Sequence, residues 1–106
     1  METTETVSYS TDSAFHALGL PDAEDLQLRA ELLKYITRII NDRDLTQSKA
    51  GALMGMDQPR VSALLNGKIT LFSTDRLLRA LSDLGQDIEV RIVPSADRKG
   101  HMWIAA

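Results

Sequence analysis

The stretch TQSKAGALMGMDQPRVSALLNGK, which runs from Thr46 to Lys68, decides the fold of this chain. Its apolar side chains recur at helical intervals, are interrupted at Gly55 and resume after Asp57. Thr46 and Asp57 are each suited to cap the start of a helix, because a short side-chain oxygen accepts a bond from an otherwise unpaired backbone N–H. The spacing therefore predicts two short helices joined by a tight turn.

Both ends of the second helix are specified by nearby residues. Pro59 falls in its first turn, where the missing N–H costs little. Asn66 and Gly67 follow its last apolar residue, and glycine is the residue that most easily adopts the left-handed conformation after a helix end. If Val61 and Leu64 face the core, the opposite side of this helix carries small and amide side chains.

That polar side is chemically suited to a DNA groove. Gln58 can bond adenine N6 and N7, and Arg60 can reach guanine or a phosphate. The short side chains of Ser62 and Ala63 allow close approach to base edges. Gln47 at the start of one helix and Lys68 after the end of the other are placed to clamp phosphates. Any one of these residues alone is more typical of an ordinary surface helix, so the combination carries the prediction. The predicted DNA-binding residues are Thr46, Gln47, Asp57, Gln58, Pro59, Arg60, Ser62, Ala63, Asn66 and Lys68.

Four short runs resemble the helix-turn-helix of the Xre/Cro/phage-repressor family: Thr46-Gln47, Leu53-Met54-Gly55, Gln58 to Ser62, and Asn66-Gly67-Lys68. From about Leu20 to Val93 the chain is similar to the HigA-like antitoxin branch of that family. The resemblance implies a DNA-binding antitoxin of a type II toxin-antitoxin system, which neutralises a RelE/HigB-like toxin and represses its own operon. It also implies a lambda-repressor-like domain of four to five helices.

One departure from the family concerns Gly51. The family usually has Ala at this position, packed against the recognition helix. Glycine inside a helix costs about 0.5–1 kcal/mol relative to Ala. We therefore expect the first helix of the motif to be slightly loose, and DNA binding to be weakened but not abolished.

The remaining helices follow from apolar periodicity and capping residues. Pro21 and Asp22 open a long scaffold helix that runs to about Arg43, and Ser73 is the expected N-cap of a last helix that Gly85 ends. We divide the chain into a flexible N-terminal tail (1–13), a helix-turn-helix DNA-binding domain (14–85) and a C-terminal β-strand or hairpin for dimerisation (86–106). The expected fold class is mainly α with this short β element.

The pattern changes to a two-residue period after Gly85, where the apolar residues Ile88, Val90 and Ile92 alternate with charged ones over 87–93. A second short run, 101–104, could pair with this strand as a hairpin. Two strands alone are marginal in water and leave edges exposed, so we predict a homodimer with a sheet at its interface. Such a dimer would set two recognition helices about 34 Å apart on a palindromic operator. The alternative is that the strands pack on their own helices and the dimer forms elsewhere.

The distribution of charge reconciles a net charge of −3 with DNA binding. Residues 1–45 carry four basic and nine acidic side chains (−5), residues 46–79 five and two (+3), and residues 80–106 three and four (−1). The basic excess coincides with the motif, as phosphate neutralisation requires. The acidic N-terminal half suits a basic toxin, although Asp22, Glu24 and Asp25 would equally complement the positive end of a helix dipole.

Composition places the chain among single-domain globular proteins, with 106 residues of which 43% are hydrophobic and 25% charged. It has no cysteine, no apolar run long enough to span a bilayer and no signal-peptide pattern, so the cytoplasm is the expected location, without a membrane partner. His16 and His101 lie at opposite ends, and the six glycines are scattered singly. We therefore expect no enzyme activity, metal or cofactor.

Three functional hypotheses remain open from the sequence. The first is the autorepressing antitoxin, which binds double-stranded operator DNA and a toxin. The second is a stand-alone or phage-type repressor, in which the N-terminal segment is only a tail. The third belongs to another class: a protein-binding module whose helix-turn-helix no longer engages DNA because of Gly51 and the acidic balance.

Overall fold

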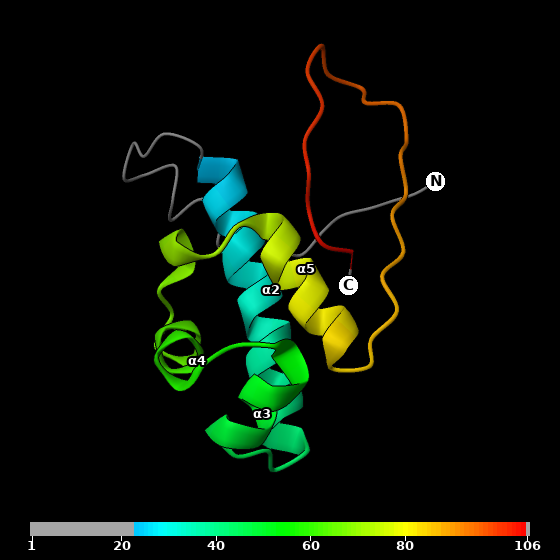
Figure 1. Cartoon of the computed structure of the whole chain (residues 1–106). Coiled ribbons are helices and arrows are strands. Elements are labelled where there is room, and N and C mark those ends of the chain that lie inside the picture. The colour runs from blue at the N-terminus through cyan, green and yellow to red at the C-terminus, as the bar shows by residue number, and fades with distance from the viewer. Residues whose placement is uncertain (1–22, 106) are drawn as a thin grey trace.

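The scaffold of the fold is one long helix, α2 (Ala23–Asp42), whose apolar residues recur every three to four positions along one side. In this computed structural model, which describes residues 23–105, three further α-helices and a 3-10 turn follow it (Figure 1). They are α3 (Gln47–Met54), α4 (Gln58–Leu65), η1 (Ile69–Leu71) and α5 (Thr74–Asp83). The predicted mainly helical fold is confirmed, whereas the expected tail at 1–13 and the start at Pro21 lie outside the described residues.

The core lies between α2 and the other helices. The buried stripe of α2 consists of Leu28, Leu32, Ile36 and Ile40, and this helix packs against α5, η1 and α4. From α5, the buried residues are Leu77, Ala80 and Leu81. Because burying a large aliphatic side chain contributes about 1.5–3 kcal/mol, this shared core is what holds the short helices α3 and α4 in place.

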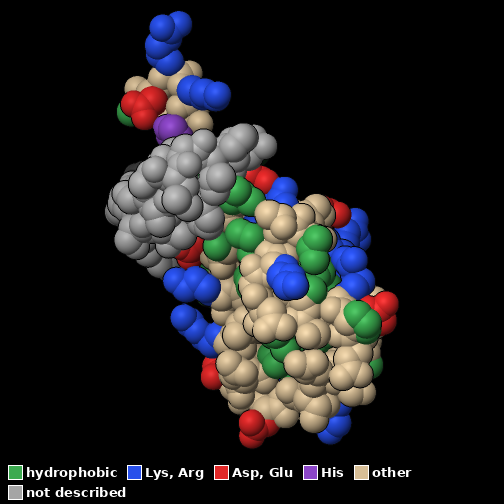
Figure 2. Space-filling model, turned by 90° about the vertical axis from the view of Figure 1, so that its left-hand side faces the viewer, with side chains coloured by type: hydrophobic (Ala, Val, Ile, Leu, Met, Phe, Trp, Pro, Cys, Tyr) green, Lys and Arg blue, Asp and Glu red, His purple; other side chains and the backbone are tan. Residues whose placement is uncertain are grey.

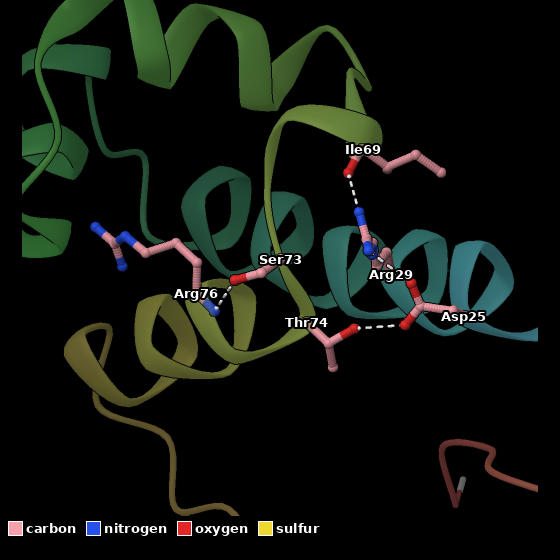
Figure 3. Close-up of polar contacts among 6 residues, drawn as sticks. All are labelled: Asp25, Arg29, Ile69, Ser73, Thr74 and Arg76. Atoms are coloured by element: carbon pink, nitrogen blue, oxygen red, sulfur yellow. Dashed lines mark hydrogen bonds and ion pairs between the residues drawn. The ribbon is translucent and has the colours of Figure 1, made fainter. Parts of the chain in front are cut away.

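Three predicted N-caps are confirmed. The side-chain oxygen of Thr46 accepts from the backbone N–H of Lys49 at 3.1 Å, and that of Asp57 accepts from Arg60 at 3.0 Å. Ser73 Oγ accepts from the backbone N–H of Arg76 at 3.0 Å and starts α5 (Figure 3). The helices α3, α4 and α5 therefore each begin directly after the short polar residue that caps them.

A polar cluster ties the first turn of α2 to the elements that follow α4. Asp25 is ion-paired with Arg29 at 2.6 Å and accepts from Thr74 Oγ1 at 3.0 Å (Figure 3). Arg29 also donates to the carbonyl of Ile69 at 3.4 Å. These contacts fix η1 and the start of α5 on α2, so Asp25 has a structural role within this domain.

The predicted β-strand at 87–93 is wrong for the single chain, as is its hairpin partner at 101–104. Residues 86–105, which we call the C-terminal arm, contain no strand, and no backbone–backbone hydrogen bond within the described residues involves 87–105. The arm leaves α5, turns back and returns towards the helices (Figure 1), where Ile104 packs against the core. A strand requires a paired neighbour, and the arm has none among these residues.

The return of the arm is marked by a contact with α2. His101 Nδ1 lies 2.9 Å from Glu24 Oε2, and its Nε2 lies 3.5 Å from Asp97 Oδ2. The arm does not cover its own helices with the alternating apolar residues, because Ile88, Val90 and Ile92 are all exposed. None of the described helices combines the length and the apolar character needed to cross a membrane.

Candidate nucleic-acid interface

The turn between α3 and α4 is closed by backbone bonds to one residue. Gly55 has the left-handed conformation (φ 67°), and its N–H donates to the carbonyl of Gly51. The N–H of Met56 donates to the same carbonyl at 2.9 Å. The chain therefore reverses within Gly55 to Asp57 and enters α4 at a fixed angle to α3.

Gly51 itself lies where α3 and the turn approach most closely. A Cβ atom on this residue would stand 2.7 Å from the backbone oxygen of Met56 and 3.1 Å from Cγ2 of Val61. Gly51 and Val61 are both buried. The expectation that Gly51 loosens α3 is therefore wrong. Glycine is the residue that permits this close packing, and an alanine here would force the turn to move.

The two faces of α4 are divided only in part as its sequence predicts, because Ala63 packs against the core. Val61 and Leu64 are buried against the core, and Leu65 is half-buried. Gln58, Pro59 and Arg60 are exposed in the first turn, whereas Ser62 and Ala63 are half-buried. The predicted base-reading side chains thus lie on the first turn and on one flank of α4, not spread evenly over its outer face.

The other predicted contact residues lie at the ends of the same two helices. Thr46 and Gln47 are exposed at the start of α3, and Asp57 is exposed at the start of α4. Asn66 and Lys68 are exposed after its end. The Asn66 side-chain amide donates to the carbonyl of Ser62 at 2.9 Å, so one of its donors already satisfies the helix terminus.

A contact that the sequence does not reveal orients Arg60. Its guanidinium lies over the ring of Phe72, 4.9 Å from the centroid, within the range of a cation–π interaction. Phe72 is buried, while Arg60 is exposed. The ring therefore holds the guanidinium end of the Arg60 side chain near Phe72 and limits the directions in which this side chain can extend. No local pattern links positions 60 and 72, so only the tertiary structure shows it.

Five basic residues between 46 and 79 carry the positive excess, and they differ in whether another described residue already binds their charged group. Arg76 donates to the carbonyl of Met54 and Arg79 pairs with Asp75. Lys49, Arg60 and Lys68 are exposed, with no ion pair to any other described residue.

Figure 2 views the molecule from the side on which α4 lies in Figure 1. The centre of this face is built mainly from uncharged side chains, with charged ones chiefly around its margin. A mainly uncharged face that also carries cations suits DNA recognition, in which base contacts specify the sequence and phosphate contacts position the protein.

A model of a helix-turn-helix domain matches residues 14–93. A solved structure of a proposed XRE family transcriptional regulator is 36% identical, with a TM-score of 0.72, over 81% of this chain and 97% of the other. The chain belongs to the XRE family of helix-turn-helix regulators. None of the curated proteins matches it.

Membership of the XRE family identifies α3 and α4 as the two helices of the motif, with α4 as its second helix. The predicted contact residues of this XRE domain lie at the start of α3, along α4 and directly after its end. Sequence reasoning missed Lys49, which is exposed in the first turn of α3 and lies on the same motif. The sequence does contain a signal for Lys49, because a cation in the first turn of this helix is placed, like Gln47, to reach a phosphate.

Proposed function

We propose that this XRE-family chain is a sequence-specific binder of double-stranded DNA that represses transcription, with α4 as its recognition helix. The observation that carries this proposal is the exposed first turn of α4 with Gln58 and Arg60, together with the exposed cations Lys49 in the first turn of α3 and Lys68 after the end of α4. Gln58 is suited to adenine and Arg60 to guanine or a phosphate, while the lysines neutralise the backbone.

Two-fold assembly is part of the proposal. One recognition helix of eight residues reaches only a few base pairs, whereas two of them, about one DNA turn apart, read a palindromic operator. A homodimer therefore fits the small size of the interface on a single chain. DNA-binding residues are proposed as predicted from the sequence, with the addition of Lys49.

The test is a fluorescence-anisotropy titration of the purified chain with a labelled duplex from the promoter of its own gene, and with a scrambled duplex of equal composition. We expect the promoter duplex to bind more tightly, and both affinities to fall as salt rises, because counterions are released from phosphates. Equal affinity for the two duplexes would reject sequence-specific binding. No binding at low salt would favour a protein-binding module instead, although Gly51 no longer supports that alternative.

For the biological role, we propose an autorepressing antitoxin that also holds a RelE/HigB-like toxin. The support is the HigA-like resemblance and the acidic excess of residues 1–45. Within the described part of that segment, Asp25 is engaged by Arg29 and Thr74, and Glu24 by His101. Glu31, Asp42 and Asp44 have no ion pair to another described residue, so they and the acidic residues of 1–22 are the better candidates for contact with a basic partner.

A stand-alone regulator is the second candidate, favoured by the similar structure, which is described only as a transcriptional regulator. Co-expression with the small basic protein encoded next to it, if one exists, separates the two roles. Rescue from that protein's toxicity, lost on deletion of residues 1–13 while promoter binding is retained, supports the antitoxin. Unchanged toxicity beside the intact chain supports the stand-alone regulator.

A further inference from the structure

The C-terminal arm exposes more apolar surface than any other part of the described chain. Exposed fractions are 42% for Ile88, 77% for Val90 and 92% for Ile92, and Met102 and Trp103 on the returning limb are exposed as well. Residues 87–105 of the arm also make no backbone–backbone hydrogen bond among the described residues. Exposed apolar side chains along an unpaired extended backbone are the usual features of a strand that lacks its partner.

The two sides of the arm differ in chemistry. Alternate side chains of an extended chain point to opposite sides, so the three apolar residues share one side and Glu89 and Arg91 share the other. The ion pair between Arg91 Nη2 and Glu89 Oε2, at 3.4 Å, agrees with this arrangement. From Ile88 to Ile92 the order is apolar, acidic, apolar, basic, apolar. When a second copy of this segment runs antiparallel to the first, apolar residues therefore face apolar residues and the acidic residue faces the basic one.

We infer that the arms of two copies of this chain pair as antiparallel β-strands across a two-fold axis at Val90. In this register, Val90 faces the partner's Val90, and Ile88 faces the partner's Ile92 on the apolar side. Glu89 then faces the partner's Arg91, twice by symmetry, on the charged side. Each backbone gains the ladder that the single chain lacks, and like charges are never opposed.

Other registers lose this complementarity. A shift of two residues opposes Glu89 to the partner's Glu89, or Arg91 to the partner's Arg91. A shift of one residue sets Val90 against a charged side chain and Glu89 or Arg91 against an isoleucine or Val90, and a parallel in-register pairing opposes every charge to itself. Since like charges directly opposite destabilise a sheet, only the register centred on Val90 satisfies both sides of the arm.

The position of the arm is compatible with DNA binding. It projects from the end of α5, on the side of the molecule away from α3 and α4 (Figure 1), so pairing leaves the recognition helices uncovered. This inference rests on the two-fold dimer of the proposed function and assigns its interface. Self-complementary charge favours a second copy as the occupant over a toxin strand, whose sequence would have to match the arm by chance.

Single-cysteine variants test the register, because the natural chain has no cysteine. Only the residue on the axis faces its own copy. Opposed residues of antiparallel strands are about 4.5–5.5 Å apart at Cα, within the range that a disulfide spans. We expect Val90→Cys to give covalent homodimers under mild oxidation at least tenfold faster than Glu89→Cys or Ile88→Cys. A mixture of Ile88→Cys and Ile92→Cys chains of different length should give the heterodimer. Equal rates for all variants would overturn the register.

A charge exchange tests the pairing without oxidation. Glu89→Arg and Arg91→Glu each create two like-charge contacts, so we expect the dimer dissociation constant from sedimentation equilibrium to rise about tenfold. The double variant Glu89→Arg/Arg91→Glu restores both contacts and should return to within about threefold of the natural chain. Thermal melting should be unchanged at concentrations where the natural chain and the variants are all monomeric, because these residues lie outside the core.

Two results would contradict the paired arms but would not contradict the proposed DNA binding. A natural chain that stays monomeric in sedimentation, yet binds the promoter, would reject the paired arms. So would a dimer that is indifferent to all three charge variants. A dimer that behaves as expected but binds no promoter DNA would instead leave the arm pairing in place and reject the proposed function.

Discussion

Gly51→Ala distinguishes close packing of the motif from a loose helix. The added methyl would stand 2.7 Å from the Met56 backbone oxygen and 3.1 Å from Val61 Cγ2, which both belong to the turn and the helix that follow. Overpacking of a well-filled core costs about 1–3 kcal/mol, whereas replacing glycine by alanine in a helix contributes about 0.5–1 kcal/mol. The difference predicts a net loss of about 1–2 kcal/mol in the free energy of unfolding.

The assay is urea unfolding followed by circular dichroism, supported by thermal melting. A loss of about 1–2 kcal/mol should lower the melting temperature of a domain of this size by roughly 4–16 °C. The matched control is Ala52→Gly, one position along on the exposed side of α3, which should cost about 1 kcal/mol by helix propensity alone. If Gly51→Ala instead stabilised the fold by the amount that Ala52→Gly costs, propensity would decide at both positions and the packing argument would be refuted.

Further predictions separate the folding role of individual residues from their role toward DNA. Ser73→Ala removes the N-cap of α5 and should lower the free energy of unfolding by about 1 kcal/mol, measured by urea unfolding, with unchanged promoter affinity; a loss of affinity would place α5 in the interface. Asp57→Ala should cost the same stability, because it removes the N-cap of α4, and its promoter affinity should change as well, since Asp57 borders the recognition helix. Lys68→Ala should leave stability unaltered and reduce the slope of log affinity against log salt by about one, for promoter and scrambled duplexes alike; an unaltered slope would remove Lys68 from the phosphate contacts.

Local signals in the sequence predicted most of the helical fold. The N-caps at Thr46, Asp57 and Ser73 were predictable because each acts on N–H groups within three residues of itself. The core stripe of α2 was predictable because its period is that of the helix. The left-handed end of α3 at Gly55 follows from the same kind of short-range preference.

Features that depend on distant contacts were not predictable in this way. The tight fit of Gly51 depends on where Met56 and Val61 come to lie, and the orientation of Arg60 depends on Phe72. For the arm, the alternation of Ile88, Val90 and Ile92 predicts a strand that the described chain does not form, because a pattern supplies no partner. Within one chain, the described residues offer no edge with which the arm could pair.

The same limit applies to the acidic half of the chain. Counting charges suggested a surface for a basic toxin, yet Asp25 is held by Arg29 and Thr74, and Glu24 contacts His101. Composition gives the number of carboxylates, but not which of them already have a partner within the fold. Assigning the toxin-facing residues therefore begins with those of 1–22 and with Glu31, Asp42 and Asp44, which have no ion pair to another described residue.

The central claim, that the first turn of α4 reads bases, is tested most directly by Gln58→Ala in anisotropy titrations with the promoter duplex and its scrambled counterpart. The account predicts that affinity for the promoter falls by about 1–3 kcal/mol, roughly 5- to 150-fold, while affinity for the scrambled duplex stays the same. The control Gln86→Ala, an exposed glutamine just after α5, should change neither. Equal effects of Gln58→Ala on both duplexes, or no effect on either, would contradict the assignment of α4 as the recognition helix.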